Sequence, residues 1–163
     1  RTFAAWHRVE DVGLPVCLQM TAEGIPQLDN ILRRVPRLRV ILDHLARPVQ
    51  EDGPPYTAAD SLWRLAAFPG VYLKVTERNF VGATTGKATI ETFFGRLVGE
   101  FGASRIAWGS NFPASERSLP ELLALAQDAL RFLQDTAREW IFSRTAQALY
   151  PALANEPALA HRP

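Results

Sequence analysis

The stretch Arg105-Ile-Ala-Trp-Gly-Ser-Asn-Phe-Pro113 reads as a short buried strand that ends abruptly in a polar turn. Its residues 106–108 are apolar, and a helical pattern follows the turn from Ser118 onward. We therefore expect the side chain of Asn111 at the carboxyl end of a strand. In parallel α/β folds that end of the sheet is where ligands bind.

Three similar units precede this stretch along the chain. Apolar runs of strand length occupy residues 14–20, 38–43 and 71–75, and helical spacing follows over about 25–35, 62–68 and 90–98. A loop is expected over 77–86, the helix after the opening stretch runs from about 119 to 133, and a last amphipathic helix spans about 136–149. Continuously apolar strands that alternate with helices indicate a parallel sheet covered on both faces. The pattern predicts an α/β fold of four consecutive βα units plus a C-terminal helix.

Four βα units are half of the eight in a (β/α)₈ TIM barrel, which typically needs about 250 residues. A doubly wound nucleotide-binding fold would want a phosphate-cradling glycine loop after the first strand, and residues 21–24 carry none. We therefore expect a half barrel or truncated barrel over residues 1–151, followed by a flexible tail over 152–163. The chain starts at Arg1 in what resembles the end of a helix, so two alternatives stay open: a fragment and a natural half-length protein.

Composition excludes several classes of function. The 163 residues are 47% hydrophobic with a net charge of +1, and no segment concentrates basic residues with aromatic ones, so nucleic acid is not an expected partner. No apolar run approaches the roughly 20 residues that span a bilayer, and no leader segment is visible, so no membrane association and a cytoplasmic location are expected. The single cysteine, Cys17, excludes a disulfide framework and is predicted to be a buried small hydrophobe.

Polar residues at the four strand ends are candidates for chemistry, and each also has a structural explanation. His44, after Asp43, is either a backbone cap or an acid/base group or ligand. Lys74 interrupts an apolar strand and so lines a pocket or forms a structural ion pair. Arg78 is either a site residue or half of a solvated pair with Glu77. Asn111 is either a site residue or a turn former, while Trp108 and Phe112 are expected to pack.

Four motifs together resemble the carboxyl-terminal half of the amidohydrolase-related (amidohydrolase 2) family. They are Val40-Ile-Leu-Asp-His-Leu-Ala-Arg-Pro48, Val71-Tyr-Leu-Lys-Val75, the opening stretch 105–113 and Arg144-Thr-Ala-Gln-Ala-Leu-Tyr150. The resemblance covers about residues 1–151. It implies a (β/α)₈ barrel of metal-dependent hydrolases, a group that includes lactonases acting on sugar lactones and pyrone dicarboxylates as well as decarboxylases of aromatic acids.

The resemblance also implies roles for particular residues. His44 matches the active-site histidine of the Asp-His-x-x-Arg-Pro motif, whereas Asn111 stands where the family has an aspartate that binds metal or activates water. Gln19 stands where metal-binding relatives often place a histidine, and the family's first-strand His-x-His would lie before Arg1. A divalent metal, zinc or manganese, with His44 as a ligand is one alternative. A metal-free site is the other, given Asn111 and Gln19.

The sequence thus predicts a hydrolase of a lactone or another small carboxylate-bearing ester or amide. His44 and Asn111 are the expected catalytic residues, and the expected substrate-binding residues are Gln19, Arg47, Lys74 and Arg78. The partners expected are a small-molecule substrate and either a missing N-terminal half or a second copy of the chain. Two alternatives stay open: a non-catalytic half-barrel that binds a partner or oligomerises, and a metal-dependent decarboxylase of an aromatic acid.

Overall fold

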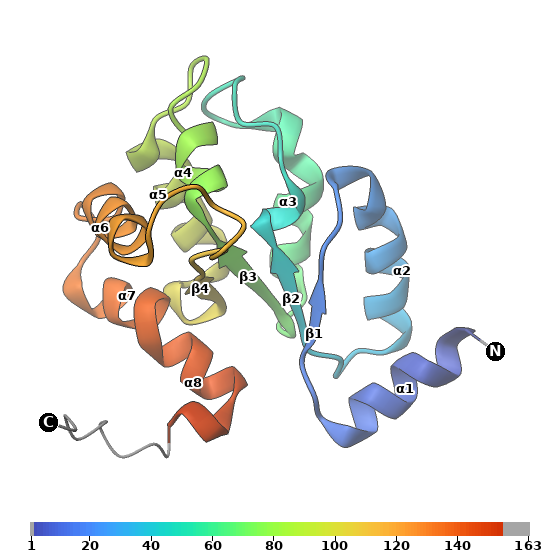
Figure 1. The fold of residues 1–163 in the computed structure, drawn as a ribbon. Coiled ribbons are helices and arrows are strands. Elements are labelled where there is room, and N and C mark those ends of the chain that lie inside the picture. The colour runs from blue at the N-terminus through green and yellow to red at the C-terminus, as the bar shows by residue number, and fades with distance from the viewer. Residues whose placement is uncertain (1, 155–163) are drawn as a thin grey trace, which may run out of the picture.

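The computed structural model describes residues 2–154, which fold into one four-stranded sheet and the helices around it (Figure 1). The strands are β1 (Val16–Leu18), β2 (Val40–Asp43), β3 (Val71–Val75) and β4 (Ile106–Trp108). The helices are α1 (Thr2–Val12), α2 (Ile25–Arg34), α3 (Asp60–Arg64), α4 (Glu77–Gly82), α5 (Ile90–Phe101), α6 (Leu119–Ala129), α7 (Asp135–Glu139) and α8 (Thr145–Leu149). Strands and helices alternate in the predicted order.

The sheet follows the chain order β1-β2-β3-β4, and every neighbouring pair is parallel. A parallel pair needs a crossover connection, which the helices between successive strands provide. The register pairs Asp43 of β2 with Lys74 of β3, and Lys74 with Ala107 of β4. All four carboxyl ends therefore meet at one edge of the sheet.

One face of the sheet carries the main core and the other is more open. In β3 the residues Val71, Leu73 and Val75 are fully buried, whereas Tyr72 and Lys74, which point to the opposite face, are only half-buried. Cys17 of the edge strand β1 is exposed, so its prediction as a buried hydrophobe is wrong. Both faces of the sheet were expected to be covered, but only one face is covered completely. Four strands are too few to close into a barrel and enclose the other face.

Aromatic rings join α3 and α5 beside the sheet. Tyr56 meets the ring of Phe93 edge-on at 5.1 Å, and Trp63 lies 5.6 Å from the same ring. The indole of Trp63 donates a hydrogen bond to the backbone oxygen of Tyr56 at 3.0 Å. Phe93 is fully buried, and burying such a side chain contributes about 1.5–3 kcal/mol.

Arg105 fixes the start of β4. Its guanidinium donates to the backbone oxygens of Phe101 at 2.7 Å, Ala66 at 3.1 Å and Phe68 at 2.9 Å. These carbonyls lie at or near helix ends, where they would otherwise be unpaired. Arg105 therefore anchors the strand that leads into the Gly-Ser-Asn turn.

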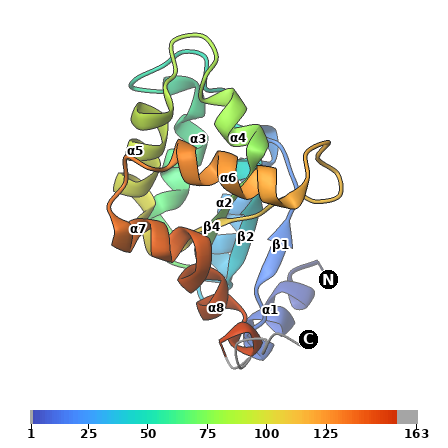
Figure 2. The same ribbon diagram turned by 60° about the vertical axis from the view of Figure 1, so that its left-hand side comes forward.

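Two elements differ from prediction. The expected loop over 77–86 begins with helix α4, because Thr76 and Asn79 form a capping box around its first turn. The expected helix over about 136–149 is α7 and α8 joined by a π-helical turn, Trp140–Arg144. Figure 2 shows α8 and α1 at the same lower end of the molecule, and Figure 1 shows that they lie on opposite sides of it. Of the predicted tail 152–163, residues 155–163 lie outside the described residues.

None of the helices within residues 2–154 combines the length and the apolar character that crossing a membrane requires.

Candidate functional site

A polar cluster links three neighbouring strands at the carboxyl edge. The Lys74 ammonium lies 2.8 Å from Oδ1 of Asp43, and the Cys17 thiol donates to the same oxygen at 2.9 Å. Lys74 therefore forms an ion pair, which was one of the two explanations expected for it; the other was a pocket residue. Although Cys17 is exposed, partial desolvation of its sulfur, and then its hydrogen bond to Asp43, raise the pKa of the thiol to about 11. The thiol is protonated at neutral pH, and Asp43 is held by two donors.

A left-handed turn follows β2 and places His44. Residues His44, Leu45, Ala46 and Arg47 all have positive φ, between 52° and 58°. Such a conformation costs about 1–2 kcal/mol for each residue other than glycine. Burial of the first three residues and a hydrogen bond of 3.0 Å from the Asn79 amide to the His44 backbone oxygen hold the turn in place. Strain of this kind persists only where the surrounding structure determines it.

The His44 imidazole is buried, and its Nδ1 lies 2.8 Å from Oγ1 of Thr76. Burial lowers the pKa of His44; the neighbouring Asp43 opposes this, and Lys74, Arg78 and Arg47 reinforce it. The ring is therefore neutral at neutral pH. Lys74, Arg78 and Arg47 lie close enough to the His44 ring for their charges to act on it, so four of the predicted residues gather at one edge.

Asn111 lies beside Arg78 in a second part of the edge. It has φ of 57°, a conformation that Asn tolerates, and its backbone oxygen accepts from the Ala114 N–H at 2.9 Å, so it does form a turn. It also lines a pocket of about 260 Å³. The pocket's lining residues are Glu77, Arg78, Asn111, Ala114, Ser115 and Glu116. Being a turn former does not remove Asn111 from the site.

Two aromatic residues of the opening stretch behave differently. Trp108 packs on Phe142, with ring centroids 6.0 Å apart, as expected. Phe112 is 57% exposed, so the prediction that it packs is wrong. The turn that contains it projects from the sheet edge, where no apolar surface of the described residues covers the ring.

Gln19 is not brought into contact with the other candidates. It follows β1 and is exposed. Within residues 2–154 its side chain makes no hydrogen bond, and it does not line the pocket that Asn111 lines.

Three further residues of the edge were not singled out from the sequence: Thr76, Asn79 and Arg117. Thr76 and Asn79 contact His44, and Glu77 accepts from the Arg117 guanidinium at 2.6 Å rather than pairing with Arg78. The spacing Thr76-Glu-Arg-Asn79 is a signal that could have found two of them, because a cap residue followed by a hydrogen-bonding side chain three positions later marks a helix start.

The donor set does not make a metal centre by itself. In the described part of the chain no group of three or more His, Cys, Asp and Glu side chains is placed to hold a metal ion. A bound zinc ion needs three or four ligands in convergent geometry. At this edge His44 is the one imidazole, and Asp43 is already engaged by Lys74 and Cys17. The residues present do not fit a metal without ligands from elsewhere.

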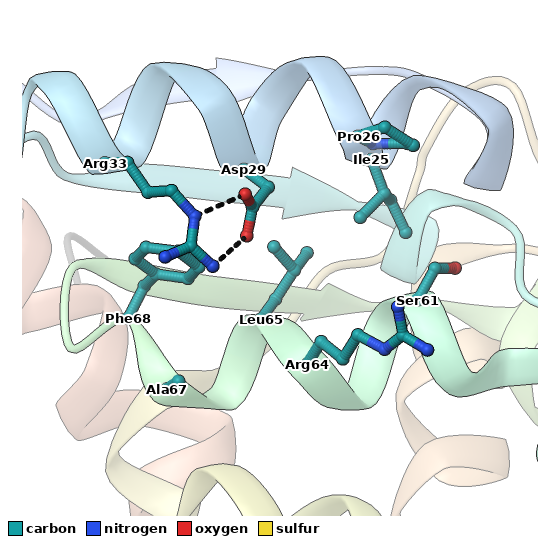
Figure 3. A pocket seen from close by; sticks show the side chains of 9 residues that line it. All are labelled: Ile25, Pro26, Asp29, Arg33, Ser61, Arg64, Leu65, Ala67 and Phe68. Atoms are coloured by element: carbon teal, nitrogen blue, oxygen red, sulfur yellow. Dashed lines mark hydrogen bonds and ion pairs between the residues drawn. The ribbon is translucent and has the colours of Figure 1, made fainter.

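A larger hollow, of about 550 Å³, lies away from this edge, in a groove between α2 and α3 (Figure 3). Arg33 pairs there with Asp29 at 2.7 Å and covers the ring of Phe68. Its lining residues are Ile25, Pro26, Asp29, Arg33, Ser61, Arg64, Leu65, Ala67 and Phe68. They include no histidine, and Asp29 is already paired with Arg33, so the groove is a poor candidate for a catalytic site.

A family model described as Amidohydrolase (Amidohydro_2) matches residues 1–152. The chain is also 30% identical, over 138 residues, to L-fucono-1,5-lactonase from Burkholderia ambifaria, an alignment that covers 80% of this chain and 48% of the relative.

Solved structures agree on the fold. An amidohydrolase from Burkholderia multivorans with bound zinc superposes with a TM-score of 0.72 at 18% identity, covering 91% of this chain and 56% of that one. A dihydroxybenzoic acid decarboxylase from Polaromonas sp. JS666, with bound manganese and the inhibitor 2-nitroresorcinol, gives 0.59 at 16% identity, covering 91% and 53%. The chain spans about half the length of these relatives, and the prediction of four βα units of a TIM barrel is confirmed.

Proposed function

Because this chain belongs to the amidohydrolase family, we propose that it forms part of a hydrolase of lactones or of other small carboxylate-bearing esters or amides. One observation carries the proposal: a neutral, buried imidazole lies among three cationic side chains at the carboxyl edge of the sheet. A neutral imidazole can polarise a carbonyl or transfer a proton, and cations bind a substrate carboxylate. The likeness to a lactonase supports the choice of reaction.

The structure favours Arg78 over Lys74 for holding a substrate carboxylate. Lys74 is already paired with Asp43, whereas Arg78 has no ion-pair partner within residues 2–154 and lines the pocket beside Asn111. In this proposal Arg78 orients the substrate, with Arg47 adding positive charge at the same edge. His44 polarises the carbonyl or transfers a proton, and Asn111 positions the attacking water through its amide.

The test is hydrolysis of two substrates, L-fucono-1,5-lactone and the carboxylate-bearing 2-pyrone-4,6-dicarboxylate. The enzyme tested is the complete assembly, in which further strands pair with the free edges of β1 and β4. Arg78→Met should raise KM for the dicarboxylate about tenfold or more and leave the neutral lactone little changed, since a charge-assisted bidentate contact is lost. Arg64→Met, a change of the same kind in the groove between α2 and α3, is the control. Hydrolysis of neither substrate, or full activity of His44→Ala, would refute the proposal.

We also propose that the sheet is completed by strands outside these four. In the described residues β1 pairs only with β2, and β4 only with β3, so each leaves one backbone edge unpaired. Such edges invite pairing with another strand. The occupant is either an N-terminal half or a second copy, and it would also supply the further ligands of any zinc or manganese.

Sedimentation and elemental analysis of the purified chain test this second proposal. A stable monomer with a stoichiometric metal would contradict it. An assembly that completes the sheet but hydrolyses neither substrate would favour the non-catalytic binding module.

A further inference from the structure

A small buried hydrogen-bond network surrounds the inner side of the His44 ring. It joins His44, after β2, to Thr76 and Asn79, at the start of α4, and these three residues are 4%, 1% and 3% exposed. Nδ1 of His44 lies 2.8 Å from Oγ1 of Thr76. Buried polar networks fix the positions of their members, because an unpaired group there is costly.

The Asn79 side chain has one consistent orientation in this network. Its oxygen Oδ1 accepts from the Thr76 N–H at 3.0 Å, while its nitrogen Nδ2 donates to the His44 backbone oxygen at 3.0 Å. Exchanging the two atoms would set two donors, or two acceptors, against each other at both ends. Asn79 Oδ1 is therefore an acceptor that is already engaged.

The single hydroxyl proton of Thr76 then has two acceptors within reach. Nδ1 of His44 is 2.8 Å away, whereas Oδ1 of Asn79 is 3.4 Å away and already accepts from the Thr76 N–H. The shorter distance to an otherwise unpaired nitrogen favours donation to Nδ1. A neutral imidazole whose Nδ1 accepts carries its proton on Nε2.

The opposite nitrogen reaches solvent. In the described part of the chain Nε2 of His44 has no hydrogen-bond partner. The polar side-chain atoms there that are both buried and without a partner are Asp52 Oδ1 and Arg138 Nε, so Nε2 is not a fully buried atom. Nε2 is thus in contact with solvent, on the ring edge opposite Thr76.

We propose that Thr76 is a positioning residue that fixes His44 as the Nε2–H tautomer, so that the ring presents a hydrogen-bond donor, and not a lone pair, to the open edge. This rests on the proposed hydrolase function, in which that donor polarises the substrate carbonyl. In the resting state His44 then lacks the Nε2 lone pair that metal ligation or proton abstraction through that atom requires. Asn79 supports the arrangement by holding the His44 backbone and leaving the Thr76 hydroxyl proton to Nδ1.

The tautomer can be measured directly by long-range ¹H–¹⁵N correlation NMR of the ¹⁵N-labelled chain at one pH above 7. His44 should show a protonated Nε2 and an unprotonated Nδ1. His7, whose side chain is 52% exposed, provides a reference in the same spectrum. An Nδ1–H signal for His44 would overturn the inference without any variant having to fold.

Three variants separate positioning from folding. Thr76→Val removes the hydroxyl and should shift the tautomer ratio roughly three- to tenfold toward that of His7, the change that loss of one net hydrogen bond brings. Thr76→Ser should restore the original ratio. Thr145→Val, which removes another buried hydroxyl bonded to the Ala103 oxygen at 3.3 Å, should leave His44 unchanged. A folded Thr76→Val protein with an unaltered tautomer would refute the role.

Kinetics of the completed assembly distinguish this inference from the proposed function. Thr76→Val should lower kcat with little change in KM, and Thr76→Ser should recover most of it. If neither lactone is hydrolysed although His44 is the Nε2–H tautomer, only the proposed function fails. If hydrolysis occurs with His44 as the Nδ1–H tautomer, only the inference about Thr76 fails.

Discussion

Asn79→Ala tests whether the left-handed turn at His44 depends on one buried amide. The substitution removes the donor to the His44 oxygen and the acceptor for the Thr76 N–H, both at 3.0 Å. The His44 oxygen keeps a partner, since it also accepts from the Arg47 N–H at 2.9 Å. The Thr76 N–H has none left among the described residues.

These two losses differ in size. An orphaned buried donor costs about 1–3 kcal/mol, and losing a bond whose acceptor keeps another partner costs about 0.5–1.5 kcal/mol. Alanine recovers roughly 0.6 kcal/mol of helix propensity relative to asparagine in α4. The free energy of unfolding should therefore fall by about 1–4 kcal/mol, which lowers Tm by roughly 2–4 °C for each kcal/mol in a domain of this size.

Chemical denaturation measures the change, and two variants sharpen it. Asn79→Asp keeps the acceptor for the Thr76 N–H but sets a carboxylate oxygen against the His44 oxygen, so it isolates the contact with the turn. Asn30→Ala removes an exposed asparagine that accepts from Arg34 at 3.1 Å, and should stay within about 0.5 kcal/mol of the parent.

Amide hydrogen exchange of Arg47 adds a local readout, because its N–H closes the turn. Faster exchange is expected in Asn79→Ala. If Asn79→Ala is no more destabilising than Asn30→Ala and Arg47 stays protected, the argument that this amide holds the turn is wrong.

Three further predictions concern separate parts of the chain. With a thiol pKa of about 11 instead of 9.0, Cys17 should hold ~100-fold less thiolate at pH 8; Asp43→Asn should speed its alkylation by iodoacetamide, and an unchanged rate would count against the contact. Burial lowers the pKa of His44 below its ordinary 6.5, so the unfolded chain binds more protons and stability should fall as pH drops below about 6.5; His44→Gln should flatten that slope in urea titrations at pH 5 to 7. Phe93→Ala should cost about 3–5 kcal/mol in denaturation, and the exposed Phe132→Ala under about 1 kcal/mol; equal losses would contradict the placement of the core.

The sequence was most informative where one physical rule governs a segment. Strand β3 has the predicted bounds, Val71–Val75. A short run of β-branched and apolar residues that directly follows Pro69-Gly70 is typical of a buried strand. Parallel strands also end at one edge, so the polar residues at or after their ends were expected together, and the charges of Lys74 and Arg78 do act on the His44 ring.

Where tertiary contacts determine the local conformation, the sequence alone could not predict it. Nothing in His44-Leu-Ala-Arg47 favours positive φ, since each of these residues resists it. The turn forms only because burial and Asn79, 35 positions away, determine it. Cys17 illustrates a second limit: an apolar run shows that a strand is buried, but not which face stays open when only four strands are present.

The charge pattern of the edge gives a reason to expect an anionic substrate. Asp43 is paired with Lys74, and Glu77 with Arg117, whereas Glu116, which lines the pocket beside Arg78, has no ion-pair partner within residues 2–154. Arg47 and Arg78 both act on His44 as positive charges and have no ion-pair partner within residues 2–154. Like charges close together raise each other's energy, and a bound carboxylate relieves that cost. The two arginines outnumber the one unpaired carboxylate of the pocket, which supports our proposal of a carboxylate-bearing lactone over a neutral one.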